Sequence, residues 1–330
     1  MEASTTYIDV IKAVIGVFGV LGNGLVCVVI AKVPTMRTLT NAIIFNQAAL
    51  DFLASLLIIL RAFKGEPNED SSLLLKTIRC FLWDPPLLVF ILFVGSTFNL
   101  VVLTLERYIA IMYPFKYMVY FGKTQVALMM VAVWVIAIGS EGRFVILHEM
   151  IDGHCAFTNI SSAAFIAHGT VTLIIEYLIP LIIMSFCYIH IAGHLKKTAA
   201  SVIPGPSTSQ NENSMSGSLI RARRNTLKTL FIVFVTFVIC WTPNQIFFFL
   251  YHLGLPLNLD GLFNISTEIL VQLNCCSNPV IYAFKYKQFQ KGLRVLLKPC
   301  CPRLAVRSDE NTVSSIVTKS TMPVRKPSVL

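Results

Sequence analysis

Charged residues are scarce in this chain of 330 residues: Asp, Glu, Lys and Arg make up 13% of it. A soluble globular protein carries about 25% of such residues. Together with a mean hydropathy of +0.71, this scarcity excludes a soluble protein and indicates an integral membrane protein. The net charge of +10 does not indicate nucleic-acid binding, because the basic residues lie in short segments between apolar runs.

Familiar catalytic and metal-binding patterns are missing as well. The nine cysteines form no CxxC pair and no Cys/His ligand spacing, which argues against a metal protein or a disulfide-dense scaffold. No Ser/His, paired-Asp or HExxH constellation supports an intramembrane enzyme. Without internal repeats or paired broken helices, a transporter that uses Asp51 as a proton relay is the weaker alternative.

Seven apolar runs are long enough to cross a membrane, since a helix needs roughly 20 residues to span the hydrocarbon. Helices are expected because backbone groups in lipid must be satisfied internally, and the alternating segments of a β-barrel do not occur. No small-residue cleavage site follows the first run, so we expect it to be retained. The runs lie at 8–31, 42–60, 87–105, 126–147, 163–192, 227–253 and 262–284. The predicted fold is an all-α seven-transmembrane helix bundle.

Basic residues gather in alternate loops and in the tail. Segment 193–228 carries six Lys and Arg residues against Glu212, and the tail after Phe284 carries ten against Asp309 and Glu310. The intervening loops are balanced or acidic. By the positive-inside rule, the N-terminus is predicted outside the cell and the C-terminus in the cytoplasm.

Several features fall on the predicted outer side. Cys80 and Cys155 are the only cysteines there, where oxidation is allowed, so they are expected to form a disulfide, with two free thiols as the alternative. Sequons at Asn159 and Asn264 are candidate glycosylation sites.

The cytoplasmic segments have three predicted features. Residues 285–298 have the pattern of a short amphipathic eighth helix lying on lipid, and Cys300 and Cys301 after it are candidate palmitoylation sites. Segment 199–220 and the tail 302–330 are predicted to be disordered. The terminal Ser328-Val329-Leu330 fits a PDZ-domain ligand, although a three-residue match also arises by chance.

Two polar features interrupt the apolar runs. Asp51 has apolar neighbours on both sides, so its carboxyl must be protonated, paired or bound to a cation. Either a cation held by Asn and Ser oxygens or a packing network of hydrogen bonds would satisfy it. Glu106 and Arg107 stand at the rim of a run, where they form either a functional pair or an arginine that reaches the headgroups.

These residues belong to an ordered set spread over the seven runs. The set comprises Gly22-Asn23, Asp51, Glu106-Arg107-Tyr108, Trp134, Pro180, Tyr188, Phe237, Cys240-Trp241-Thr242-Pro243 and Asn278-Pro279-Val280-Ile281-Tyr282. With it, residues 8–301 resemble a rhodopsin-like (class A) G-protein-coupled receptor. The resemblance implies a plasma-membrane receptor rather than an enzyme, with a heterotrimeric G protein, arrestin and receptor kinases as partners.

The resemblance also implies roles for individual residues. Arg107 would be held by Glu106 at rest and would engage Tyr188, Tyr282 and the G protein when active. Phe237, Trp241 and Pro243 would transmit ligand binding to helix six, with Asn278 and Pro279 bending helix seven, and Phe115 would insert into the G protein. Asp51, Ser96, Asn274 and Asn278 would form the family's sodium pocket.

Departures from the family pattern reduce the number of ligand classes to be expected. Val89 replaces the aspartate of amine receptors and Gln272 the retinal-linking lysine of opsins, so an amine and retinal are not expected. Arg223 stands where an acidic partner of Arg107 is common.

The outer cavity is expected to be lined by Arg61, Val89, Arg143, His168, Glu176, Asn244, Gln245, Glu268 and Gln272. Its charged members could meet a ligand or pair with one another. The overall pattern is similar to neuropeptide receptors of the somatostatin and galanin sort. A neuropeptide is therefore the expected ligand, and a small non-amine ligand is the alternative.

Overall fold

The computed structural model describes residues 2–63, 72–83, 87–145, 147–151, 154–158, 160–201 and 210–298. The long helices are α1 (Glu2–Lys32), α2 (Leu39–Ala62), α4 (Leu87–Met112), α6 (Lys123–Glu141), α7 (Ser162–Thr172), α8 (Ile179–Ser201), α9 (Gln210–His252) and α10 (Leu262–Lys285). The shorter elements are α3 (Leu73–Ile78), α5 (Pro114–Tyr120), α11 (Lys287–Leu297) and the strands β1 (His148–Ile151) and β2 (His154–Phe157). A π-helical segment, Leu173–Leu178, joins α7 to α8 into one long rod.

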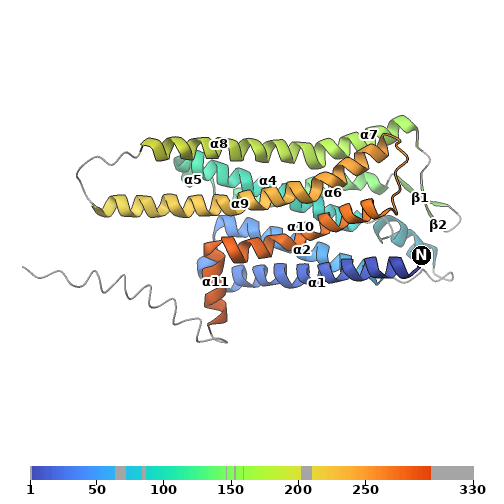
Figure 1. Cartoon of the computed structure of the whole chain (residues 1–330), viewed down its shortest axis with the longest axis horizontal. Coiled ribbons are helices and arrows are strands. Elements are labelled where there is room, and N and C mark those ends of the chain that lie inside the picture. The colour runs from blue at the N-terminus through green and yellow to red at the C-terminus, as the bar shows by residue number, and fades with distance from the viewer. Residues whose placement is uncertain are drawn as a thin grey trace, which may run out of the picture.

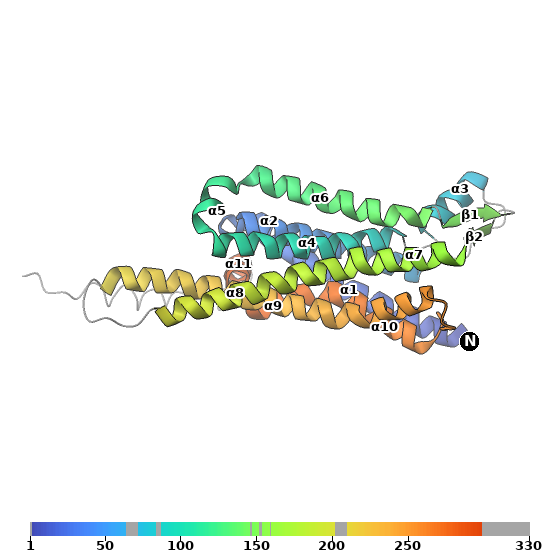
Figure 2. The same ribbon diagram turned by 90° about the horizontal axis from the view of Figure 1, so that it is seen from above.

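The long helices lie side by side along one axis (Figures 1 and 2). The N-terminus, α3 and the antiparallel β1–β2 hairpin lie at one end, called here the hairpin end. The opposite end, called here the α11 end, carries α5, α11 and the projecting tips of α8 and α9. The loops therefore alternate between the two ends, as the predicted topology requires.

The spans match the predicted runs. Six helical segments among the described residues are long and apolar enough to cross a membrane. They are Tyr7–Lys32, Leu39–Ala62, Leu87–Met112, Lys123–Glu141, Ser162–Lys197 and Leu227–His252. With α7 and α8 counted as one rod, α10 is the seventh long helix among the described residues. It is more polar than the others because it contains Asn264, Thr267, Asn274 and Asn278, all of which are buried.

Polar side chains lie inside the bundle and large apolar ones outside. Asn23, Asn41, Asp51 and Asn99 are at most 1% exposed, whereas many Phe, Leu and Ile side chains on the outer faces are exposed. Such a distribution fits lipid as the surrounding solvent, because hydrocarbon has no partners for polar groups.

Two predicted boundaries are wrong. The fourth span was predicted to reach residue 147, but α6 ends at Glu141 and a 3-10 turn, Gly142–Val145, leads into the hairpin. Segment 199–220 was predicted to be disordered, but α9 begins at Gln210. Extending an existing helix costs far less than starting one, so a polar segment can continue a long apolar helix.

Glycines let α1 approach its neighbours closely. A Cβ on Gly19 would clash with Ser55 Oγ of α2, and one on Gly22 would lie 3.0 Å from Pro279 Cβ of α10. The side-chain amide of Asn23 donates to the carbonyl of Cys275, at 2.9 Å, across the same contact. The packing of α1 thus places the middle of α10 beside the polar residues of α2.

A short helix follows α10 where the amphipathic eighth helix was predicted. Helix α11 turns away from the bundle axis (Figure 1) and buries Phe289 and Gly292. A Cβ on Gly292 would lie 3.0 Å from Val29 of α1, so the helix packs closely on the bundle. The division into a receptor domain, 1–301, and a tail, 302–330, stays a prediction, since the tail lies outside the described residues.

Candidate functional site

The side chains of Glu106 and Arg107 are paired at the α11 end of α4. The Arg107 guanidinium donates to both carboxylate oxygens of Glu106 and to the hydroxyl of Thr40 on α2. Thr40 Oγ1 in turn donates to Glu106 Oε1, at 3.1 Å. The carboxylate of Glu106 is fully buried and the Arg107 side chain is 19% exposed. The pair is therefore a buried ion pair rather than an arginine that reaches toward the headgroups.

Tyr117 of α5 completes this cluster. Its hydroxyl donates to Glu106 Oε1 at 2.6 Å. Burial and the neighbouring carboxylate raise the pKa of Tyr117, so the phenol stays protonated and keeps donating. Thr40 and Tyr117 were missed by the sequence analysis. Neither residue is unusual in its own segment, and only the packing of α2 and α5 on α4 brings them to Glu106.

The tyrosines assigned to the active state lie elsewhere. The hydroxyl of Tyr188 is 3.4 Å from Thr104 Oγ1, and its ring packs on Phe231 and Phe234 of α9. Tyr282 is 1% exposed, and its hydroxyl has no hydrogen-bond partner among the described residues. Arg107 is therefore bound to its acidic neighbour and to neither tyrosine.

Other predicted residues at the α11 end fit a contact surface. Phe115 of α5 is 79% exposed, and Met118, Val119 and Tyr120 beside it are exposed as well. The phenol of Tyr108 lies 2.9 Å from His190 Nδ1 of α8. The side chain of Arg223 lies outside the described residues.

An aromatic core lies in the C-terminal half of α9. The ring of Trp241 packs edge-on against Phe93 of α4, with centroids 5.9 Å apart, and tilted against Phe237, at 6.0 Å. Pro243 lies inside α9, where it removes one backbone hydrogen bond and favours a bend. The hydroxyl of Thr242 is hydrogen-bonded to Tyr177 in the π-helical segment, so this core connects α9 to the α7–α8 rod.

The predicted polar cluster around Asp51 forms in the middle of the bundle. Asp51 Oδ1 accepts from Ser96 Oγ at 2.7 Å, and Oδ2 accepts from Asn278 Nδ2 at 2.9 Å. Oδ2 also accepts from Gln47 Nε2, at 3.2 Å. Asn274 does not join these hydrogen bonds to Asp51, and its Oδ1 is without a partner in the described part of the chain. Gln47 was missed, although it precedes Asp51 by one helical turn and so shares its face.

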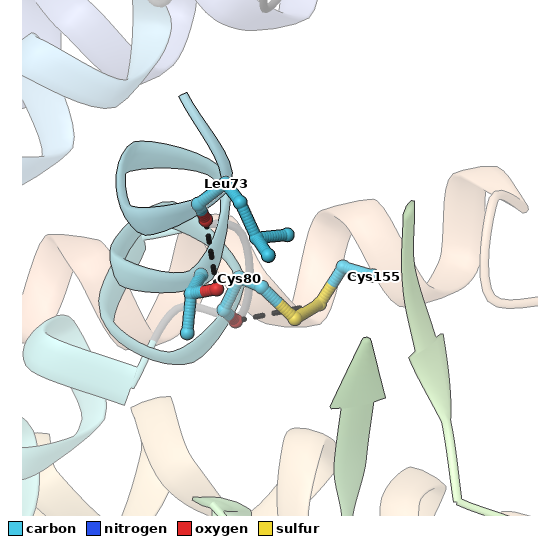
Figure 3. Close-up of a disulfide and its surroundings, with 4 residues drawn as sticks. Leu73, Cys80 and Cys155 are labelled. Atoms are coloured by element: carbon cyan, nitrogen blue, oxygen red, sulfur yellow. Dashed lines mark hydrogen bonds between the residues drawn. A yellow bond between two sulfur atoms is a disulfide. The ribbon is translucent and has the colours of Figure 1, made fainter. Parts of the chain in front are cut away.

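At the hairpin end, the predicted disulfide between Cys80 and Cys155 is confirmed. Figure 3 shows the bridge between the π-helical turn Arg79–Trp83 and strand β2, with Cα atoms 5.2 Å apart. Cys80 is 1% exposed, in the turn that precedes α4. The bridge holds the hairpin across this end of the bundle.

The expected ligand residues Arg143 and Glu176 contact each other. The Arg143 guanidinium forms an ion pair with Glu176 Oε1. Glu141, which the sequence analysis did not single out, is 1% exposed and interacts electrostatically with both residues. Two buried acids therefore lie close to one guanidinium at the hairpin end, and Glu176 is the one that forms the ion pair.

Four of the remaining expected ligand residues contact another side chain or a backbone carbonyl, and the other three are buried or half-buried. His168 stacks on His252 of α9, with centroids 5.3 Å apart, and Glu268 pairs with Lys12 of α1 at 2.9 Å. Asn244 donates to Thr267 Oγ1 at 3.1 Å, and Arg61 donates to the carbonyl of Trp83. The others are buried or half-buried: Val89, Gln245 and Gln272.

Asn264 does not fit the predicted glycosylation site. It is 2% exposed, and its Nδ2, the atom that would carry a sugar, donates to Leu259 O and Glu268 Oε1. The other predicted modification and docking sites lie outside the described residues: Asn159, Cys300, Cys301 and Ser328-Val329-Leu330.

Comparison with known proteins adds to this geometry. The family described as the 7 transmembrane receptor (rhodopsin family) matches residues 22–282. A QRFP-like peptide receptor of Branchiostoma floridae is 26% identical and covers 96% of this chain and 84% of its own length. Galanin receptor 2b of Danio rerio is 25% identical, covering 97% and 84%. The histamine H2 receptor of Homo sapiens is 28% identical, covering 92% and 82%.

Proposed function

The chain belongs to the rhodopsin family of seven-transmembrane receptors, and from this we propose that it binds a peptide at the hairpin end and activates a heterotrimeric G protein at the α11 end. Members of this family are signalling receptors rather than enzymes. They have seven transmembrane helices, so the chain is a multi-pass membrane protein. In the proposed orientation the hairpin end is outside the cell, and the basic loops lie in the cytoplasm.

The observation that carries the proposal is the buried Glu106–Arg107 pair. In the described arrangement Arg107 is occupied by Glu106 and Thr40, while Tyr188 and Tyr282 have no bond to it. An agonist would shift the protein toward a second state in which Arg107 leaves Glu106 and meets these tyrosines and the G protein. It can do so only by binding that state more tightly than the resting one.

A peptide ligand is supported by the names of the peptide-receptor relatives and by the residue at position 89. Val89 is 6% exposed and offers no carboxylate to an amine. The ion pairs Arg143–Glu176 and Lys12–Glu268 at this end could open to receive charged groups of a peptide. A small non-amine ligand is the second candidate. The histamine H2 receptor is similar over most of both chains, but histamine is an amine, and Val89 offers an amine no carboxylate.

The test measures guanine-nucleotide exchange in membranes that contain the wild-type chain or Arg107→Ala. We expect basal or peptide-stimulated exchange from the wild type and none from Arg107→Ala at equal surface expression. Lys116→Ala, a cation of α5 outside the Glu106 cluster, is the matched control and should retain exchange. Undiminished exchange by Arg107→Ala would contradict the role of the pair.

The ligand class follows from the same assay. A library of peptides and a library of small molecules without amines are screened on the wild-type chain. Activation by peptides alone supports the proposal, and activation by small molecules alone replaces it with the second candidate.

Further partners are part of the proposal. Arrestin and receptor kinases would act on the cytoplasmic side, and a PDZ domain would bind the C-terminal residues 328–330. Palmitoylation at Cys300 and Cys301 would hold α11 against the lipid.

A further inference from the structure

The carboxylate of Asp51 is satisfied without a cation. It is fully buried, and it accepts hydrogen bonds from three neutral side chains: Gln47, Ser96 and Asn278. Gln47 is itself fully buried, so its amide is part of the cluster rather than a group at its margin. The question is whether this donor set fits a sodium ion, which requires oxygen lone pairs directed at it.

Two neighbouring amides determine which way Gln47 faces. Asn99 Nδ2 donates to the backbone carbonyl of Ile43, at 3.1 Å, and this carbonyl can only accept. The orientation of the Asn99 amide is thereby fixed, and its second N–H donates to Gln47 Oε1, at 2.8 Å. Gln47 must therefore present its NH2 group, and not its oxygen, to Asp51.

The NH2 group of Gln47 uses the lone pairs that a cation would need. One N–H points to Asp51 Oδ2, and the other points to Ser96 Oγ. Ser96 donates its only hydroxyl proton to Asp51 Oδ1, so its oxygen acts as an acceptor for Gln47. A sodium ion between Asp51 and Ser96 would be repelled by the two partly positive N–H hydrogens of Gln47 that point at these oxygens.

We propose that the Gln47 amide closes this cluster to sodium. An uncharged side chain then occupies the place of a cation in the cluster of hydrogen bonds that joins α2, α4 and α10. The arrangement differs from the sodium pocket that the family resemblance implied at Asp51, Ser96, Asn274 and Asn278. The proposal concerns the resting protein alone and does not depend on the ligand proposed above.

The same geometry predicts what removal of the amide would create. Without Gln47 Nε2, Asp51 Oδ2 and Ser96 Oγ each regain a free lone pair. Asn274 Oδ1 and Asn278 Oδ1 are buried oxygens without a partner among the described residues. A carboxylate, a hydroxyl and nearby amide oxygens form the kind of oxygen set that a hard cation prefers. Gln47→Leu should therefore gain a sodium site.

The experiment measures the thermal midpoint of the purified full-length chain in detergent, in sodium chloride and in N-methylglucamine chloride at equal ionic strength. We expect the wild-type midpoint to differ by less than about 1 °C between the salts, because a ligand stabilises only a protein that binds it. Gln47→Leu should be higher in sodium by about 3 °C or more. The double variant with Asp51→Asn should lose this difference.

Two controls keep the result specific. Asn46→Leu removes an amide one residue away that bonds Asn99 but not Asp51, so it should stay insensitive to sodium. Gln47→Ala replaces Gln47→Leu if the leucine variant does not fold. A sodium-dependent midpoint of the wild-type chain that Asp51→Asn abolishes would overturn the proposal. A midpoint of the folded Gln47 variant that ignores sodium would overturn the assignment to Gln47.

Discussion

Two fully buried carboxylates of this receptor, those of Glu106 and Asp51, are satisfied in opposite ways. Glu106 is bound by a guanidinium and two hydroxyls, whereas Asp51 is bound by two amides and one hydroxyl. A charge-assisted pair can exchange one partner for another and so can operate as a switch. A network of neutral donors ties several helices to one oxygen pair and is suited to holding them in register.

The exposure of the two clusters fits this difference. The Arg107 side chain is 19% exposed at the α11 end, so its guanidinium can leave Glu106 without first crossing a packed interior. Gln47 and Asn99 are 0% exposed, and each of their amides is bonded at both ends. A buried network of this kind is costly to leave half satisfied.

Of the changes that test the difference between the two carboxylates, Glu106→Gln is expected to have the largest effect, on basal nucleotide exchange. The variant keeps the shape of the side chain but loses the charge that holds Arg107, and a charge-assisted hydrogen bond contributes about 1.5–3 kcal/mol. Basal nucleotide exchange should rise about tenfold, because 1.4 kcal/mol corresponds to a factor of ten. Glu149→Gln on β1, at the hairpin end, serves as the control and should leave exchange unchanged. Equal basal exchange in both variants would mean that Glu106 does not restrain Arg107.

A smaller effect, on stability rather than signalling, is expected from Asp51→Asn. An amide at this position offers one acceptor to three donors and adds an NH2 group, so at least one buried hydrogen bond is lost. The cost is about 1–3 kcal/mol, or roughly 3–8 °C in the thermal midpoint of the purified protein. Asp260→Asn, in an exposed loop, is the matched control. A midpoint equal to that of the wild type would contradict the view that neutral donors to a carboxylate stabilise the bundle.

The smallest effect is expected from Tyr117→Phe. This change removes one hydrogen bond from Glu106 and leaves Arg107 and Thr40 in place, at a cost of about 0.5–1.5 kcal/mol. The lower half of this range corresponds to a rise in basal exchange of roughly two- to fivefold, which is below the effect of Glu106→Gln. Tyr7→Phe, at an exposed tyrosine of α1 near the hairpin end, should behave as the wild type. A rise equal to that of Glu106→Gln would assign the restraint to Tyr117 rather than to the ion pair.

Much of the fold could be predicted because lipid imposes strict demands on sequence. A span needs about 20 apolar residues, so the runs at 8–31, 42–60 and 87–105 lie within the observed helices. The ends were less predictable. Gly142 and the hairpin shortened the fourth span, and α9 extended into a polar segment whose composition is typical of a loop.

The candidate site was predicted only in part, because a sequence names the costly residues but not their partners. Glu106, Arg107 and Asp51 stood out as charges in apolar runs. Their partners Thr40, Tyr117 and Gln47 did not, since polar residues at the edges or faces of helices are common. Asn264 illustrates the reverse error, because its sequon is intact in sequence and buried in the fold.

The sequence by itself determined that this chain is a seven-helix membrane receptor with buried charges at fixed positions along its helices. Apolar run length and the placing of ionisable groups depend on the chain alone. Which neutral or charged side chain reaches each buried carboxylate depends on how the helices are rotated against one another. Only the tertiary structure therefore decided that a guanidinium meets Glu106 while the Gln47 amide meets Asp51.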